Sequence, residues 1–281
     1  MGKIGIITDS TCDLTKELLE ENNIEKLPLY VTIGGKTYQD GVDITTKELY
    51  ALVDKLGELP KSSSISSSAF EEYFKGYLKD YDQLLYIGIG SKLSGTYQNA
   101  LMASKEFEEG TIYVADSQNL SSGIGLLLLK ACKFRDEGKS VKEIYEEVTK
   151  LVPNVRTQFA INTLKYMHMG GRCSGFSRLL SITLKIKPIL RVVNGTLGVG
   201  KKPIGYNRAL KELLQYINND KENLDTDCVM VTHAAADSDA VYLKEELSKM
   251  LPGQRVCETF AGGVIATHCG PRTIGILYIV K

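Results

Sequence analysis

Three polar segments, far apart in the chain, carry the side chains best suited to chemistry. A serine-rich run begins at Ser62, a glycine-bearing loop carries Ser94, and His268 lies near the C-terminal end. Hydroxyl and imidazole donors that converge on one point suit a carboxylate or a phosphate better than they suit bond cleavage. The first hypothesis is therefore an anion-binding site built from these three segments.

The loop around Ser94 follows a predicted strand and precedes a predicted helix. Residues 84–100 read LLYIGIGSKLSGTYQNA, with an apolar run, breaks at Gly88 and Gly90, and helical spacing from Tyr97. In open parallel sheets such turns lie at the carboxyl ends of the strands, where ligands bind. A helix start also attracts anions through its unpaired N–H groups. Ser94 is the best-placed donor, although capping of the helix is an equally good explanation.

A second turn of the same kind follows the first predicted strand, residues 3–8. Asp9, Ser10 and Thr11 lie there, just before a predicted helix at residues 15–21. Serine, threonine and aspartate are favoured as helix caps. The alternative is that Asp9 or Ser10 lines the same rim as Ser94, and the sequence leaves both readings open.

Several enzyme motifs are missing from the sequence. There is no phosphate-binding G-x-x-x-x-G-K-[ST] loop, and the pair Gly88 and Gly90 lacks a third glycine at dinucleotide-binding spacing. Ser94 is not in a G-x-S-x-G motif. A nucleophile–base pair of Ser94 and His268 nevertheless keeps a serine acyl hydrolase as an alternative.

The cysteines and histidines do not predict a metal site. The six cysteines are dispersed, with no C-x-x-C pair, and the three histidines lack metal-ligand spacing. We therefore expect free thiols, no metal and no cofactor. The cysteines are Cys12, Cys132, Cys173, Cys228, Cys257 and Cys269, and the histidines are His168, His233 and His268.

The composition is that of an ordinary globular protein. The 281 residues are 43% hydrophobic and 24% charged, with a formal net charge of zero. A neutral chain without a basic stripe is not expected to bind nucleic acid. We see neither a signal peptide nor an apolar run long enough to span a bilayer, and we expect a cytoplasmic location.

The first half of the chain repeats a strand, a polar turn and a helix, which predicts an α/β domain with a doubly wound, mostly parallel sheet at residues 1–155. Predicted strands are 3–8, 27–33, 84–87 and 111–115. The serine run at 62–68 has the composition of a linker, but it is short and is better explained as a second hydroxyl-rich loop facing Ser94.

The second half, residues 156–281, predicts a mixed-sheet α/β domain. Predicted strands are 156–161, 187–193, 228–233 and 255–260, with an Asn194-Gly195 hairpin after the second of them. Predicted helices are 162–169, 206–218 and 238–250, and 264–276 is read as a polar turn before a final strand. The apolar segments 159–167 and 176–190 are candidates for the walls of a pocket.

Six short motifs follow one another along the chain: TDSTCDL at 8–14, DGVDI at 40–44, SGT at 94–96, GGR at 170–172, IKPIL at 186–190 and HCGP at 268–271. Together and in this order they resemble the DegV family of fatty-acid-binding proteins, which includes the binding subunits of bacterial fatty acid kinase. The resemblance covers essentially the whole chain.

The resemblance implies a two-domain α/β fold with a long-chain fatty acid, such as palmitate, held between the domains. It implies that Ser62, Ser94 and His268 hold the carboxylate, and that this chain has no catalytic residue of its own. Further head-group contacts are expected from Ser63, Gly95, Thr96 and Arg272.

A partner is implied as well. A fatty acid kinase would phosphorylate the bound carboxylate, with Arg172 as a surface contact, which places the chain in lipid transport and metabolism. A carrier of another anionic amphiphile, without a kinase, is the third hypothesis beside the fatty-acid carrier and the hydrolase.

The sequence departs from the family pattern at two places near the expected head group. The first loop usually reads Thr-Ser-Gln-Pro-Ser, and here Ser62 replaces the threonine and Ile65 the proline, which predicts a less rigid loop. Arg272 stands where a glycine is usual. An extra cation there would either tighten anion binding or reshape the turn.

Overall fold

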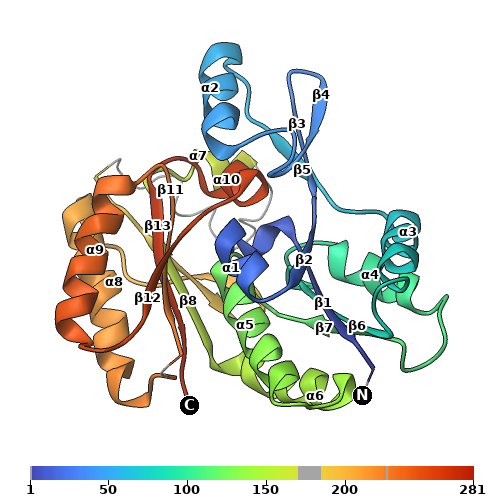
Figure 1. The fold of residues 1–281 in the computed structure, drawn as a ribbon. Coiled ribbons are helices and arrows are strands. Elements are labelled where there is room, and N and C mark those ends of the chain that lie inside the picture. The colour runs from blue at the N-terminus through green and yellow to red at the C-terminus, as the bar shows by residue number, and fades with distance from the viewer. Residues whose placement is uncertain (1, 170–184, 226) are drawn as a thin grey trace.

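The structure is a computed structural model that describes residues 2–169, 185–225 and 227–281. The described residues form three sheets with the strand orders β2-β1-β6-β7, β10-β9-β8-β13-β11-β12 and β4-β3-β5. In Figure 1 the first sheet lies on the right, the second on the left, and the small third sheet at the top.

The first sheet is parallel throughout and has helices on both faces. Its strands are β1 (Ile4–Asp9), β2 (Ile24–Leu27), β6 (Gln83–Gly88) and β7 (Ile112–Asp116). The helices around it are α1 (Lys16–Glu21), α3 (Ser67–Tyr77), α4 (Thr96–Ser104), α5 (Ser122–Asp136) and α6 (Val141–Leu151). The prediction of a doubly wound parallel sheet is confirmed. The strand order reverses between β1 and β6, the kind of position at which such sheets bind ligands.

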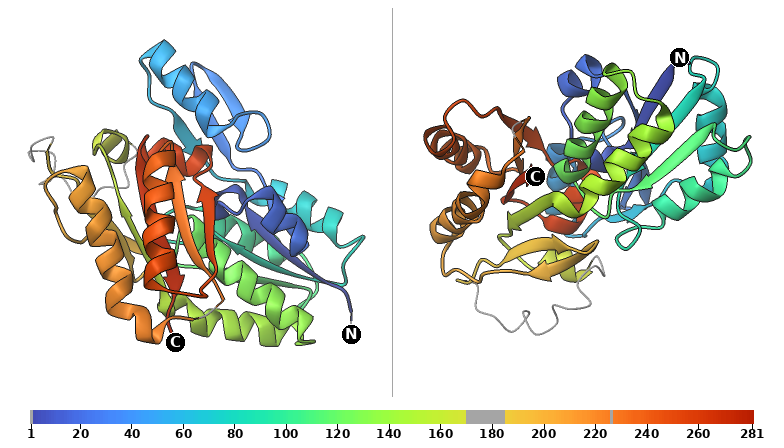
Figure 2. Two further views of the ribbon diagram at one scale, coloured as in Figure 1. Left: turned by 60° about the vertical axis from the view of Figure 1, so that its left-hand side comes forward. Right: turned by 90° about the horizontal axis from the view of Figure 1, so that it is seen from below.

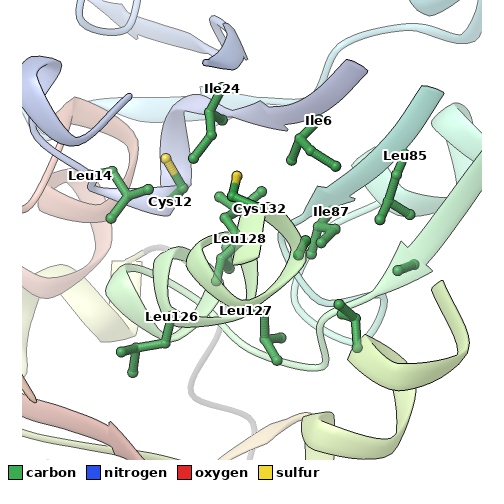
Figure 3. Close-up of a cluster of buried hydrophobic side chains, with 14 of the residues drawn as sticks. Ile6, Cys12, Leu14, Ile24, Leu85, Ile87, Leu126, Leu127, Leu128 and Cys132 are labelled. Carbon is green, nitrogen blue, oxygen red and sulfur yellow. The ribbon is translucent and has the colours of Figure 1, made fainter. Parts of the chain in front are cut away.

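Alternate residues of the first sheet supply two separate cores, as the period of a strand requires. Ile6 and Leu85 lie on the α5 side and belong to one apolar cluster with Leu128 and Cys132 (Figure 3). Tyr86 points to the opposite side and packs on Phe70 of α3, with ring centroids 5.2 Å apart. Both faces are therefore buried, which explains why these strands are nearly continuous apolar runs.

Helix α5 is a shared layer between the first and second sheets. Its residues are buried around most of its circumference, as expected of a helix enclosed on all sides. Met230 and Leu277 of the second sheet belong to the same apolar cluster as Ile6 of the first. The predicted division into domains at residues 155 and 156 stays a prediction, because this helix packs on both sides of it.

The second sheet is mixed, as predicted. Its strands are β8 (Val155–Ala160), β9 (Ile189–Val193), β10 (Thr196–Val199), β11 (Val229–Ala234), β12 (Val256–Phe260) and β13 (Thr273–Ile279). Its helices are α7 (Lys165–Met169), α8 (Tyr206–Asp220), α9 (Asp237–Met250) and α10 (Gly263–Cys269). Helices α8 and α9 cover one face, as Figure 2 shows. The hairpin at Asn194 and Gly195 is confirmed, with φ angles of 50° and 76°.

The third sheet was not predicted. Residues 27–33 do not form one strand, because β2 ends at Leu27 and β3 (Tyr30–Ile33) begins a different sheet. Pro28 separates the two, and a proline has no N–H group to continue a ladder. β4 (Lys36–Gln39), β5 (Lys61–Ser63) and helix α2 (Thr46–Leu56) complete this small unit.

One further prediction for a polar stretch is corrected, and another is refined. Residues 264–276 are not simply a turn, since Gly263–Cys269 form helix α10 before β13 begins. The serine run is divided between β5 and the cap of α3, where Ser66 accepts a hydrogen bond from the Ala69 N–H. Three short 3-10 helices complete the described elements: η1 (Ser10–Cys12), η2 (Val152–Asn154) and η4 (Lys221–Asn223).

A search of the described residues gives three further results. None of their helices is long and apolar enough to cross a membrane. Within the same residues no group of three or more His, Cys, Asp or Glu side chains is arranged to hold a metal ion. Free thiols are confirmed for the five described cysteines, whereas Cys173 lies outside the described residues.

Candidate functional site

A cavity of about 290 Å³ is lined by residues of the second and third sheets and by loops that follow strands of the first sheet. This is close to the lower end of the range of roughly 300–1,000 Å³ that is usual for small-molecule sites. Much of its wall is apolar, and its lining includes Ile89, Leu93, Phe159, Met167, Leu197 and Leu277. The predicted head-group residues Ser62, Ser63, Ser94, Gly95 and His268 line the same cavity. The structure thus brings the three polar segments to one apolar space.

The wall residues come only partly from the predicted segments. Phe159 and Met167 line the cavity as predicted, whereas residues 176–184 lie outside the described residues. Leu190 packs in the core behind Phe159 and is not among the lining residues. Leu197 of β10 was missed, and the signal for it was the alternation of apolar residues after the Asn194-Gly195 hairpin.

Gly275 keeps the floor of the cavity open. It lies in β13 between Phe159 of β8 and Thr232 of β11, which pair with it on either side. A Cβ atom at this position would lie 2.8 Å from the carbonyl oxygen of Gln158 and 2.9 Å from Cβ of Phe159. Only glycine, which has no Cβ atom, can lie this close to Gln158 and Phe159. Its missing side chain leaves room between the neighbouring strands.

Ser62 and His268 meet directly, although 206 positions separate them. Ser62 lies in β5, His268 lies in the last turn of α10, and the distance from Oγ to Nε2 is 2.8 Å. When Nε2 carries a proton and donates it to Ser62, the serine proton is free for an anion. The pair can therefore present a hydroxyl donor beside an imidazole that is able to become positively charged.

Ser94 is held by the start of α4. Its Oγ accepts a hydrogen bond from the Thr96 N–H at 3.3 Å and lies 2.9 Å from Oγ1 of Thr96. When the buried Thr96 hydroxyl donates to it, the Ser94 proton remains available to a ligand. Ser94 therefore bonds to the first residue of α4 and also lines the cavity, whereas the N-cap of the helix is Gly95 and has no side-chain capping bond. Thr96 is not a lining residue and would act through Ser94.

The pair of Ser94 and His268, on which the hydrolase alternative depended, is not formed. Nε2 of His268 bonds to Ser62, and the Ser94 hydroxyl bonds to Thr96. A hydroxyl nucleophile has to lie within hydrogen-bond reach of its base. This geometry therefore gives the hydrolase hypothesis no support through Ser94.

Asp9 and Ser10 do not share the rim with Ser94. Both are buried, and neither lines the cavity. Asp9 caps η1 by accepting the Thr11 N–H at 2.9 Å, so the capping explanation is confirmed. Its second oxygen accepts the Tyr86 hydroxyl at 2.6 Å and the Ile89 N–H at 3.0 Å, which joins the ends of β1 and β6.

His233 also lines the cavity, but its ring has other partners. Nδ1 accepts the Ala236 N–H at 3.2 Å, and Nε2 lies 3.1 Å from Glu258. With Nδ1 as an acceptor, the proton of the neutral ring is on Nε2 and is donated to the carboxylate. His233 therefore offers no free donor to a ligand, unlike Ser62 and Ser94.

Ile65, which replaces a proline of the family pattern, is an anchor for the serine loop. Its side chain is fully buried in the core that contains Phe70 and Tyr86. Its carbonyl oxygen accepts a hydrogen bond from Asn99 of α4 at 2.7 Å. These contacts hold the loop in place without the ring of a proline.

Arg272 turns away from the predicted head-group site. Its guanidinium lies over the Tyr206 ring, 4.2 Å from the centroid, and its Nε donates to Asp239 at 3.1 Å. It is not among the lining residues. Its φ of 59° lies in the left-handed region, which explains why glycine suits this position. Arg172, the predicted partner contact, lies outside the described residues.

We expect Arg272→Gly to leave fatty acid affinity unchanged and to alter stability by less than about 1 kcal/mol. Relief of the left-handed strain, about 1 kcal/mol, offsets the loss of a half-exposed ion pair and a cation–π contact of similar size. Ligand titration and thermal unfolding of the variant check this. A clear loss of affinity would restore Arg272 to the head-group contacts.

The fold and the cavity define a class of protein: an α/β protein with an apolar ligand cavity that carries hydroxyl and imidazole groups in its wall. The chain belongs to the DegV family, because the family model described as "Uncharacterised protein, DegV family" matches residues 3–281. A DegV domain-containing protein of Clostridium acetobutylicum is 35% identical over 281 residues, covering 100% of both chains.

Solved structures of the family superimpose closely on this chain. A DegV family protein from Thermus thermophilus, described by its fatty acid binding, has a TM-score of 0.93 at 30% identity, covering 99% of this chain and 100% of that one. DegV of Bacillus subtilis, described as a fatty acid binding protein, has a TM-score of 0.91 at 28% identity, with 100% of both chains covered. The DegV-like fold is therefore established for this chain.

Proposed function

We propose that this protein binds a long-chain fatty acid in the cavity between its sheets, with the carboxylate held by Ser62, Ser94 and His268. The observation that carries the proposal is that all three polar residues line one apolar cavity. The fatty acid binding described for the relatives from Thermus thermophilus and Bacillus subtilis supports the same ligand class.

The physical chemistry of the cavity agrees with such a ligand. Burial of each methylene contributes about 0.8 kcal/mol, so a sixteen-carbon chain such as palmitate gains on the order of 10 kcal/mol before the costs of ordering. A carboxylate that leaves water needs donors, or binding loses several kcal/mol. Ser62 and Ser94 can supply protons, and His268 can supply a charge. Ser63 and Gly95 line the same cavity and complete the proposed head-group contacts.

We further propose that the protein presents the carboxylate to a fatty acid kinase and is not the catalyst itself. The support is the resemblance of the GGR segment at residues 170–172 and of the other motifs to kinase-associated members of the family. Formation of an acyl phosphate consumes a nucleoside triphosphate, which places the proposed step in the cytoplasm. The chain would then act in lipid transport and metabolism.

Native mass spectrometry of the freshly purified protein, followed by organic extraction, tests the ligand. We expect a stoichiometric mass excess that matches a fatty acid, and the extract then reports chain length and unsaturation. A different anionic amphiphile in the extract would replace the fatty acid as ligand. A mass without excess, with no uptake of added palmitate, would contradict the proposal.

A separate variant tests the kinase step. We expect Arg172→Glu to retain palmitate affinity and to lose most partner-dependent phosphorylation, since a reversed charge opposes docking of a complementary surface. The measurements are palmitate titration and acyl phosphate formation with a purified fatty acid kinase. If palmitate retention falls instead, Arg172 has a structural role and the partner contact is not supported.

A further inference from the structure

Helix α10, which carries His268, begins without a side-chain cap of its own. Its N-cap residue is Gly262, so the first N–H groups need acceptors from elsewhere. Two carboxylates from the first 40 residues accept them. Asp13 accepts the Gly262 N–H at 2.8 Å, and Asp40 accepts the N–H groups of Gly263 at 2.6 Å and Val264 at 3.1 Å.

Both carboxylates are buried and are held by further hydrogen bonds. Asp13 is 5% exposed and Asp40 is 1% exposed. Ser10 donates to Asp40 at 2.9 Å, and Ser121 donates to Asp13. Burial raises the pKa of both carboxyls, and these hydrogen bonds oppose the shift. Such a costly arrangement fixes the helix start in one position, because the N–H groups of Gly262, Gly263 and Val264 would lose their buried acceptors if the helix moved.

The fixed N-terminal end of α10 is joined to the candidate head-group site by little more than one turn of helix. His268 follows Gly263 by five residues, or roughly 7.5 Å along a helix axis. The chain on either side of α10 belongs to the second sheet, through β12 and β13, whereas Asp13 and Asp40 follow strands of the first and third sheets. A shift of the helix start would therefore move the His268 ring relative to Ser62.

We propose that Asp40 and Asp13 are positioning residues that set His268 against Ser62 and thereby tune the affinity for a carboxylate head group. This inference rests on the proposed fatty acid function. Asp40 has the larger part, since its two oxygens accept two successive N–H groups of the helix. Neither residue lines the cavity, so both act through α10 and not by touching the ligand.

The test is Asp40→Asn, which keeps the size of the side chain and removes one acceptor and the charge. We expect palmitate affinity to fall about tenfold, as for one lost hydrogen bond to a charged group. Affinity for hexadecanol, which has the same tail and no carboxylate, should stay unchanged. In a His268→Ala background the Asp40→Asn substitution should cost no further affinity, because the residue through which it acts is absent.

The matched control is Asp43→Asn. Asp43 lies three positions away, is exposed, and its carboxylate accepts the Gln39 N–H at 2.9 Å. We expect it to leave the affinity for both ligands unchanged. Asp40→Asn could instead lower the affinity for palmitate and for hexadecanol equally, or its effect on palmitate affinity could add to that of His268→Ala. Either result would show a general structural effect and overturn the inference.

A measurement without ligand separates this inference from the proposed function. The ¹H–¹⁵N signals of the His268 ring should shift in Asp40→Asn and remain in place in Asp43→Asn, because the bond from Nε2 to Ser62 is altered only in the first. If the wild-type protein binds no palmitate, the proposed function fails, and the ring signals still decide the positioning role. Unchanged His268 signals in Asp40→Asn would overturn it.

Discussion

Replacement of Ser94 or His268 by alanine is expected to weaken palmitate binding about 10- to 100-fold in each case. Each substitution removes a hydrogen bond to a charged carboxylate, worth about 1.5–3 kcal/mol, and every 1.4 kcal/mol is a factor of ten. The loss of His268 also deprives Ser62 of its partner, since Oγ of Ser62 lies 2.8 Å from Nε2. Titration with palmitate and with hexadecanol measures the effect, and hexadecanol affinity should hardly change.

Ser91→Ala is the matched control for the serine variant. Ser91 lies in the same loop as Ser94, but its hydroxyl donates to Asp116 at 2.6 Å and it is not a lining residue. Palmitate affinity should remain at the wild-type value. Wild-type affinity in both Ser94→Ala and His268→Ala would rule out the assigned carboxylate site.

Asp9→Ala is expected to cost at least about 3 kcal/mol of stability, the largest effect of any single substitution considered. The fully buried carboxylate accepts from the Tyr86 hydroxyl and from the N–H groups of Ile89 and Thr11. Each buried donor left without a partner costs roughly 1–3 kcal/mol. Burial and the neighbouring Asp9 raise the pKa of Tyr86, so this side chain stays a neutral donor.

Two variants calibrate the Asp9 prediction by thermal unfolding. Tyr86→Phe removes one donor and keeps the ring, so about 1 kcal/mol is expected. Asp116→Ala also removes a carboxylate that accepts from Ser91 and from the Gln118 N–H, but water can replace it at this partly exposed site. A loss of 1 kcal/mol of stability lowers the midpoint of thermal unfolding by about 2–4 °C, so Asp9→Ala should lower this midpoint by at least about 6 °C. A shift no larger than that of Asp116→Ala would contradict this account.

Local patterns predicted the strands and most helices because each depends on nearby residues. The run at residues 3–8 became β1, and Tyr97 fell within the first turn of α4. Where a local pattern had two solutions, the prediction failed. Residues 27–33 are apolar apart from Thr32, and only Pro28 within them marks the change of sheet. Residues 263–269 were predicted as part of a turn, and buried acceptors from elsewhere in the chain hold the start of the helix that they form.

The candidate site was predicted as residue types and not as contacts. Ser94 after a buried strand could be placed at the edge of a sheet from its own surroundings. Nothing near His268 in the chain indicates that Ser62 is its direct partner, and a direct contact of His268 with Ser94 was considered only for the hydrolase alternative. Asp13 and Asp40 appeared only as members of motifs, since a carboxylate that caps a helix more than 200 positions away has no local signal.

The sequence by itself determined the α/β class, the parallel first sheet, the hydroxyl-bearing turns and the resemblance to the DegV family, because these follow from local spacing and from short motifs. Only the tertiary structure decided that β5, the start of α4 and α10 line one cavity, and that the first 40 residues hold the helix of His268. The physical reason is that contacts across hundreds of positions depend on how whole sheets and helices pack, with α5 between them. The residues next to each contact in the sequence do not predict that packing.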